Sequence, residues 1–135
     1  MNEEQSKFAA GVNVAVLATV DKRGNPHATP VWYLFDDGAF RINVGRGGQK
    51  HKNVEHNPEV TLVIDSRALP YYALMLHGRV EVGGPFSDAD RLRLATRYLG
   101  DDLGKRYVEM TAGEDSVGIT LRPRKVIVFD PRVRT

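Results

Sequence analysis

The sequence predicts a mainly β domain, in which six or seven antiparallel strands close into a split barrel with small helices between them. Segments with apolar residues at every second position recur through the chain, and turn sequences rich in Gly, Asn, Asp and Pro separate them. Apolar residues at helical spacing are confined to short segments. An antiparallel sheet of this length in a small domain usually removes its edges by closing, so we expect a barrel.

Length and composition fit a single domain, residues 1–135, that is large enough to bury a core. No run of about 18 apolar residues would span a membrane, and residues 1–5 lack a hydrophobic signal region. The chain has no cysteine, which excludes disulfides and thiolate chemistry. A net charge of +2 is too small to indicate nucleic-acid binding. We expect a cytoplasmic protein.

The N-terminal third predicts one helix and three strands. Asn2 suits the cap of the helix and Gly11 its end. The first strand is apolar on both faces and should be covered on both sides. Asp36-Asp37-Gly38 reads as a hairpin turn. The expected elements are a helix over residues 3–10 and strands over residues 12–20, 27–35 and 39–44.

The remainder predicts three short helices and four strands. Gly78 lies inside a long strand and suggests a bulge or a bend at a barrel corner. Ser87 suits a helix N-cap, Gly100 ends that helix, and Pro123 divides the last two strands. The expected strands cover residues 58–65, 71–82, 116–121 and 125–129, and the helices lie before Pro58, from Ser87 to Gly100 and over residues 101–110.

The stretch that connects the strand over residues 39–44 to the next helix has the features of an anion site. Gly45, Gly47 and Gly48 allow a close approach of the backbone, and the first amides of a helix attract negative charge. Arg46, Lys50 and Lys52 add positive charge there. The same residues also suit a glycine-rich hairpin exit with solvated lysines, and the glycine spacing matches neither the nucleotide-hydrolase loop nor the dinucleotide fingerprint.

Other reactive residue types form no recognisable catalytic or metal-binding pattern. The four histidines have no metal-ligand spacing, so we expect solvated or hydrogen-bonded rings. No serine lies in a nucleophile elbow, and no acid/base pair of carboxylates is evident. Pro30 within a strand indicates an edge or a bulge, where free backbone groups can meet a flat polar ligand. Trp32 is expected in the core, and Tyr71 either fills the barrel or forms an aromatic wall.

Three stretches follow one another in a recognisable order. Residues 24–33 read Gly-Asn-Pro-His-Ala-Thr-Pro-Val-Trp-Tyr, residues 41–45 Arg-Ile-Asn-Val-Gly, and residues 50–60 Lys-His-Lys-Asn-Val-Glu-His-Asn-Pro-Glu-Val. This order resembles the pyridoxamine-5′-phosphate-oxidase-like superfamily, whose fold is the FMN-binding split β-barrel. With Arg-Tyr-Leu-Gly (97–100), Gly104 and Tyr107, the chain is most similar to the branch of flavin/deazaflavin oxidoreductases that use coenzyme F420. The resemblance covers nearly the whole chain.

The resemblance implies a homodimer with a cofactor in grooves at the subunit interface. Lys50 matches the family's phosphate-binding lysine, residues 29–32 match the segment along the cofactor ring, and Tyr71 matches an aromatic that reaches the partner's site. Gly48 stands where many relatives carry a basic residue, and Arg46 is the expected substitute. The implied cofactor-binding residues are Thr29, Pro30, Val31, Trp32, Asn43, Gly45, Arg46, Gln49, Lys50, Asn53 and Tyr71.

The implied activity is hydride transfer from reduced F420 to a small conjugated or quinone-like substrate. The proton that follows the hydride would come from His27, Tyr33, Tyr71 or solvent. Two alternatives stay open. The same fold serves FMN-dependent oxidases and flavin reductases, and it also serves carriers that bind a cofactor or haem without catalysis.

Overall fold

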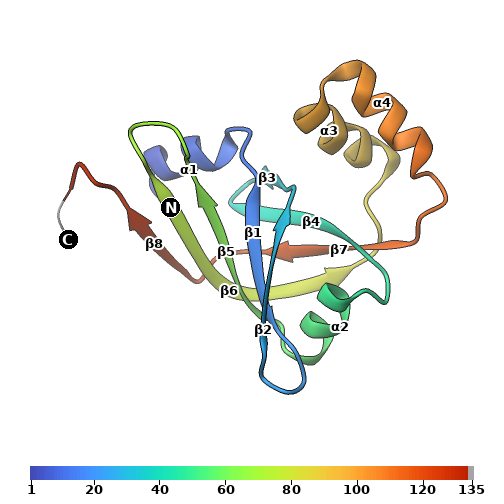
Figure 1. The fold of residues 1–135 in the computed structure, drawn as a ribbon, viewed down its shortest axis with the longest axis horizontal. Helices are drawn as coiled ribbons and strands as arrows, with labels where there is room; N and C mark the ends of the chain where they lie inside the picture. Colours follow the sequence, from blue (N-terminus) through green and yellow to red (C-terminus); the bar gives the residue numbers. More distant parts are fainter. Residues whose placement is uncertain (134–135) are drawn as a thin grey trace.

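The computed structural model describes residues 1–133 and confirms the split antiparallel barrel. Within these residues, eight strands form one curled sheet and four helices lie around it (Figure 1). The helices are α1 (Glu3–Ala10), α2 (Gln49–His56), α3 (Asp88–Leu99) and α4 (Asp101–Met110). The strands are β1 (Ala15–Val20), β2 (Pro26–Val31), β3 (Leu34–Asp36), β4 (Ala39–Gly45), β5 (Glu59–Asp65), β6 (Ala73–Gly83), β7 (Ser116–Leu121) and β8 (Lys125–Phe129).

The strand order explains why the sheet curls. Hydrogen-bonded neighbours run β2-β1-β5-β6-β7-β4-β3, and β8 pairs with β6 beside this path. β2 and β3 therefore lie at opposite ends of the order, although only Trp32 and Tyr33 separate them along the chain. Such a short connection brings the two ends of the sheet together, and no ladder joins them. The barrel is split at this point.

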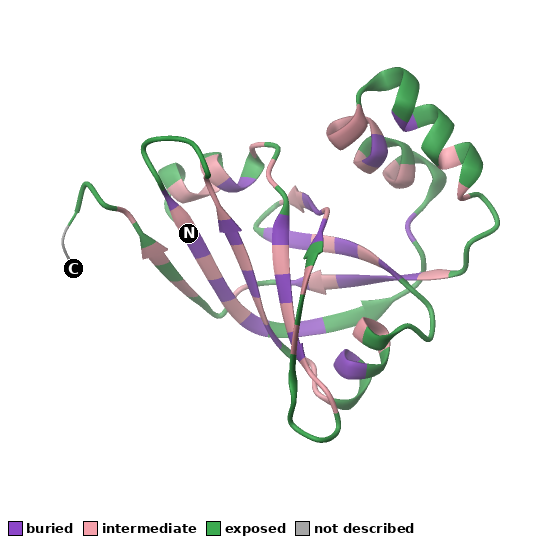
Figure 2. Cartoon of the chain, viewed as in Figure 1, coloured by how far each residue is buried: buried purple, intermediate pink, exposed green. Residues whose placement is uncertain are grey.

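Alternation along the strands builds the core, as the sequence predicts. Phe40, Ile42 and Val44 of β4 and Val60, Leu62 and Ile64 of β5 are all buried. Figure 2 shows the same alternation along the other long strands, with the outer surface of α4 exposed. Burying each large aliphatic side chain stabilises the fold by about 1.5–3 kcal/mol, so this face of the sheet dominates stability.

The predicted helix caps are confirmed for two helices. The Asn2 side chain accepts a hydrogen bond from the Gln5 amide in a capping box, and Ser87 Oγ accepts one from the Asp90 amide. Gly100, with a φ of 83°, ends α3. The start of α2 differs, because no side chain caps it.

The predicted strand over residues 12–20 is wrong at its beginning. β1 starts at Ala15, and Val12 and Val14 are 61% and 51% exposed rather than covered. Side chains of α3 donate hydrogen bonds to main-chain carbonyls of the segment before β1. Tyr98 donates to Asn13 O at 2.7 Å, and Arg97 donates to Gly11 O at 2.5 Å. Because these carbonyls already have partners, the segment does not join the ladder.

The predicted strand over residues 27–35 is interrupted, which raises the number of strands to eight. The residues before the interruption pair with β1 and those after it pair with β4. The Tyr33 amide donates to the Tyr98 hydroxyl at 3.2 Å, which replaces a ladder partner. The prediction that Trp32 lies in the core is wrong. Trp32 lies at this interruption, half-buried beneath α3 and α4.

Gly78 marks a crossing of two segments. The long strand begins at Ala73, not at residue 71, and its ladder with β5 passes Gly78 without a bulge. A Cβ on Gly78 would lie 2.8 Å from Leu121 Cδ1 and 3.2 Å from the Arg122 carbonyl. β6 pairs with β8 before Gly78 and with β7 after it. A larger residue here would force Leu121 and the β7–β8 connection to shift where this connection passes over β6.

Candidate functional site

A cavity of about 310 Å³ lies between the split end of the sheet and the α3–α4 pair. The barrel contributes residues from β2, β4, β7 and the first turn of α2, and the helices contribute the opposite wall. The lining residues are Val14, Pro30, Val31, Trp32, Asn43, Lys50, Arg91, Leu94, Ala95, Tyr107, Val108, Thr111, Glu114 and Ser116. Five of the eleven predicted binding residues are among them: Pro30, Val31, Trp32, Asn43 and Lys50.

The first turn of α2 places a cation at the cavity. β4 ends at Gly45, and the following turn is shaped by Gly47, whose φ of 76° favours glycine. Gly48 is the N-cap and offers no side chain, and His51 Nδ1 accepts a hydrogen bond from the Gly47 amide just before it at 2.9 Å. Lys50, in the first turn, lines the cavity. This combination of uncapped amides and an ammonium group suits an anion.

Two buried polar atoms beside the cavity lack partners within the described part of the chain. They are Thr29 Oγ1 and Asn43 Oδ1, from β2 and β4. A buried polar atom without a hydrogen bond costs about 1–3 kcal/mol. Asn43 lines the cavity, and Thr29 precedes the lining segment Pro30–Trp32. Polar ligand groups can satisfy such atoms, which fits the predicted role of this strand segment.

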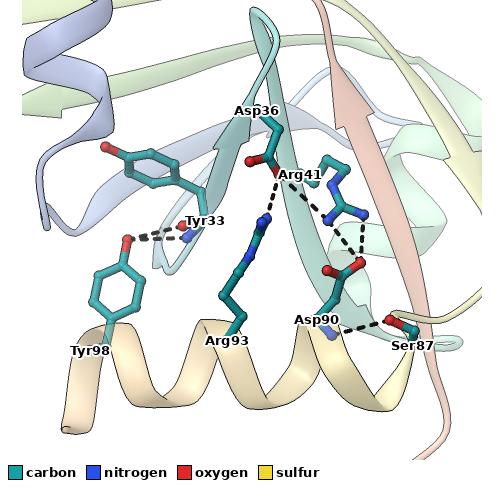
Figure 3. Close-up of polar contacts among 7 residues, drawn as sticks. All are labelled: Tyr33, Asp36, Arg41, Ser87, Asp90, Arg93 and Tyr98. Carbon is teal, nitrogen blue, oxygen red and sulfur yellow. Dashed lines mark hydrogen bonds and ion pairs between the residues drawn. The ribbon is translucent and has the colours of Figure 1, made fainter.

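Aromatic rings form one wall of the cavity. The rings of Trp32 and Tyr98 are stacked, with centroids 5.0 Å apart, and the Tyr107 ring lies 5.5 Å from Trp32. Tyr98 also binds the chain at the split, because its hydroxyl contacts both the amide and the carbonyl of Tyr33 (Figure 3). The wall is therefore fixed to the interruption between β2 and β3.

Ion pairs attach the other end of α3 to the barrel. Both Nη atoms of Arg41, on β4, donate to Asp90 Oδ2 at 2.9 and 2.8 Å (Figure 3). Arg93 pairs with Asp36 beside them. The two helices pack closely on each other at Gly104, where a Cβ would lie 2.8 Å from the Thr96 backbone. Side chains thus hold a rigid helical pair over the cavity.

The other predicted binding residues lie outside the cavity. Arg46 is paired with Asp115 at 2.9 Å, so its charge is engaged on the surface. Gln49 donates to Asn53, and the buried Asn53 amide donates to Thr19 Oγ1 at 2.9 Å, which fastens α2 to β1. Gly45 is exposed at the end of β4. Tyr71 is 50% exposed and lines a separate hollow beside α1.

None of the three side chains suggested as proton donors lines the cavity. His27 is hydrogen-bonded to Asp21 at 3.0 Å, and this contact lowers the pKa of the Asp21 carboxyl to about 2. Tyr33 is fully buried and donates to the Ala9 carbonyl at 2.7 Å. Burial raises the pKa of Tyr33 to about 12. Tyr71, the third suggested proton donor, lines the separate hollow beside α1.

The helical wall of the cavity was not predicted from the sequence. Arg91, Leu94, Tyr107, Val108 and Thr111 line the cavity from α3, α4 and the residue after α4. Periodicity predicts the helices but not where they dock. The sequence alone places Leu103 and Tyr107 at helical spacing, and only the structure shows that they stay 55% and 42% exposed. Large exposed apolar side chains are typical of binding surfaces.

Residues 1–133 contain no cluster of three or more His, Asp or Glu side chains placed to hold a metal ion. In the same range, no helix has the length and apolar character needed to cross a bilayer.

Comparison with known structures supports the fold. The chain is 25% identical to an F420 reductase, with a TM-score of 0.77 over 94% of this chain and 98% of that one. It is 24% identical to a conserved hypothetical protein from Mycobacterium tuberculosis, with a TM-score of 0.77 over 96% of this chain and 85% of the other. The haem storage protein HutZ from Vibrio cholerae matches at 17% identity and a TM-score of 0.68, over 94% and 92% of the two chains.

Comparison with curated proteins finds no match. A family model described as pyridoxamine 5′-phosphate oxidase matches residues 1–133, which include every strand and helix of the barrel. The chain therefore belongs to the pyridoxamine 5′-phosphate oxidase family.

Proposed function

We propose that this protein is an F420H2-dependent oxidoreductase that transfers a hydride to a small conjugated or quinone-like substrate. One observation carries the proposal: Pro30, Val31, Trp32, Asn43 and Lys50, inferred from the sequence as cofactor residues, line one cavity. The structural similarity to an F420 reductase over nearly the full length of both chains supports it.

The residues around the cavity fit a planar cofactor with a phosphate. The uncapped start of α2 and the Lys50 ammonium suit the phosphate, and a charge-assisted hydrogen bond there contributes about 1.5–3 kcal/mol. The partnerless Thr29 Oγ1 and Asn43 Oδ1 suit polar atoms at the edge of a ring. Trp32 and Tyr107 offer apolar surface to its face.

When bound, reduced F420 supplies the hydride. In this proposal the protein orients the ring along β2, holds the phosphate at α2 and covers one side of the cavity with the α3–α4 pair. Because none of His27, Tyr33 and Tyr71 lines the cavity, solvent delivers the proton.

FMN is the competing cofactor. A terminal phosphate dianion calls for a richer group of cations than F420, whose phosphodiester carries less charge at that position. Gly48 supplies none, and Arg46 is paired with Asp115. Among the described residues, Lys50 is then the single cation that the α2 turn contributes to the cavity. This low positive charge at the phosphate position favours F420 over FMN.

A haem carrier is the non-catalytic alternative. Haem iron in proteins is held by His, Cys, Met or Tyr side chains. Among the described residues that line the cavity, Tyr107 is the single side chain of these types, and it packs against Trp32. The lining therefore favours a planar organic cofactor over haem.

The proposal includes a homodimer, in which Tyr71 reaches the partner's cavity. Large apolar side chains that are exposed beside Tyr71 support it, because a subunit interface would cover them. They are Val12 and Leu69, which line the same hollow as Tyr71. Sedimentation at micromolar concentration should give a dimer, and a monomer would contradict the shared site.

Turnover tests the proposed activity. The cofactor-free protein is mixed with F420H2 and a quinone acceptor without oxygen, and the reappearance of oxidised F420 is followed by absorbance. Oxidation that depends on both protein and acceptor is the expected result. Binding of F420H2 without turnover of any acceptor would instead indicate a carrier.

A further inference from the structure

Arg91 places a guanidinium group in the helical wall of the cavity, whereas Lys50 comes from the barrel side. The Arg91 side chain is only 18% exposed. An arginine is rarely this buried unless its charge has a partner. The contacts of Arg91 therefore decide what the group is available to bind.

Among the described residues, one nitrogen of Arg91 makes hydrogen bonds, and its partners are neutral. Nη2 donates to Thr111 Oγ1 at 2.8 Å and to the Val108 carbonyl at 3.3 Å. The Thr111 hydroxyl donates in turn to the Tyr107 carbonyl at 2.9 Å. These bonds fix the guanidinium at the end of α4 without neutralising it. Within residues 1–133, no hydrogen bond engages Nε or Nη1.

Other arginines around α3 differ from Arg91. Arg41 and Arg93 pair with carboxylates, and Arg97 donates to main-chain carbonyls. Within the described chain, the one carboxylate within ion-pair distance of Arg91 is Asp88, whose Oδ1 lies 4.0 Å from Nη1 on a fully exposed side chain. A solvated pair at this distance contributes little, so most of the Arg91 charge stays uncompensated.

The charge of the cavity favours an anion. Lys50 and Arg91 are cations and the exposed Glu114 is an anion, so the lining has a formal charge of +1. In the proposed function, Lys50 binds the phosphate of the cofactor. Arg91 then remains for a second negative group, beside the rings of Trp32 and Tyr107.

We propose that Arg91 forms an anion subsite and that the substrate is a planar conjugated molecule with a carboxylate. Arginine recognises carboxylates through several N–H donors, and the aromatic wall suits a flat ring beside it. The carboxylate site depends on the cavity alone, whereas its assignment to a substrate rests on the proposed function.

Trp32 is the only tryptophan in the chain, and it lines the cavity. Its indole N–H resonance therefore reports binding directly. Cofactor-free protein is titrated with 2-naphthoate and with 2-naphthamide, which share a ring and differ in charge. We expect wild type to bind the carboxylate about tenfold more tightly than the amide. R91Q should remove this preference and leave affinity for the amide unchanged.

Three variants locate the effect. R106Q alters an exposed arginine of α4 that lies outside the cavity and should leave both affinities unchanged. E114Q should strengthen binding of 2-naphthoate, since it removes the negative charge from the lining. K50Q should keep a preference for the carboxylate. A preference that survives in R91Q, or that disappears only in K50Q, would overturn the subsite.

Equal weakening of both probes in R91Q would also overturn the subsite, because it would show a structural role. Titration with F420 in the same samples separates the two proposals. If wild type does not bind F420 but prefers 2-naphthoate, and R91Q lacks that preference, the assignment of F420 as cofactor is contradicted and the Arg91 subsite is supported. Normal F420 binding without that preference would contradict the subsite alone.

Discussion

The indole ring of Trp32 lies nearly parallel to the phenol ring of Tyr98, with centroids 5.0 Å apart and an angle of 6° between their planes. Trp32 sits where the barrel is split, and Tyr98 comes from α3. The Tyr98 hydroxyl donates to Asn13 O and accepts from the Tyr33 amide. The pair therefore joins the helical wall to the interruption in the sheet.

Removing the Tyr98 hydroxyl should weaken this junction. We expect Y98F to lower the free energy of unfolding by about 1–2 kcal/mol, because a part-buried amide and carbonyl lose their partner. Urea unfolding measures the change. Y107F is the control, since no hydrogen bond of the Tyr107 hydroxyl is recorded within the described residues. Equal effects of the two variants would contradict the role of Tyr98.

The ion pair between Arg41 and Asp90 should contribute more than its surface counterparts. Asp90 accepts two hydrogen bonds from Arg41 and is 27% exposed, whereas Asp88 is fully exposed in the same helical turn. We expect D90A to cost about 1–2 kcal/mol and D88A less than about 0.5 kcal/mol. Thermal unfolding of both variants tests this, and the helix dipole acts similarly on each.

Gly104 should resist substitution although alanine is the better helix former. A Cβ there would lie 2.8 Å from the Thr96 backbone, so α3 and α4 would have to separate. Overpacking of this kind outweighs the helix-propensity gain, and we expect G104A to lose about 1–2 kcal/mol. G113A, which meets no atom within 4 Å, should be nearly neutral. Stabilisation by G104A would contradict the close packing.

Tyr33 should make the fold sensitive to alkali. Burial raises its pKa from about 10 to about 12, so between these pH values the unfolded chain releases a proton that the folded chain keeps. Stability then falls as pH rises through this window, by roughly 2–3 kcal/mol at most.

The Tyr33 effect is measured by urea unfolding between pH 9 and pH 12. Y33F should be about 1 kcal/mol less stable at neutral pH, because the bond to the Ala9 carbonyl is lost. Its stability should then decline less steeply above pH 10. Y71F, at an exposed tyrosine, should follow the wild-type curve. Identical slopes for Y33F and wild type would contradict the burial effect.

Local sequence rules predicted the elements well because their causes are local. Alternation gave β4 and β5, and Asn2, Ser87 and Gly100 marked helix ends through their own backbone contacts. The interruption at Trp32 and Tyr33 escaped prediction because its hydrogen-bond partner, Tyr98, is distant in the sequence. Val12 and Val14 were wrongly predicted as strand for the same reason, because Arg97 and Tyr98, which bind the carbonyls of this segment, are also distant in the sequence.

The candidate site likewise contains residues that the sequence predicted and residues that depend on distant contacts. Pro30, Asn43 and Lys50 belong to stretches that resemble the family, so the sequence identified them before they were seen to line one cavity. Arg91 and Thr111 join that cavity only because α3 and α4 dock over it, through Arg41 and Trp32 among other residues. No pattern within α3 specifies where the helix docks.

Side-by-side titration of cofactor-free protein with F420 and with FMN tests the central claim most directly. We expect F420 to bind more tightly, and K50Q to weaken it about tenfold or more through loss of a charge-assisted bond. K52Q, an exposed neighbour outside the cavity, should have little effect. Tighter binding of FMN, or F420 binding that is indifferent to Lys50, would contradict the account.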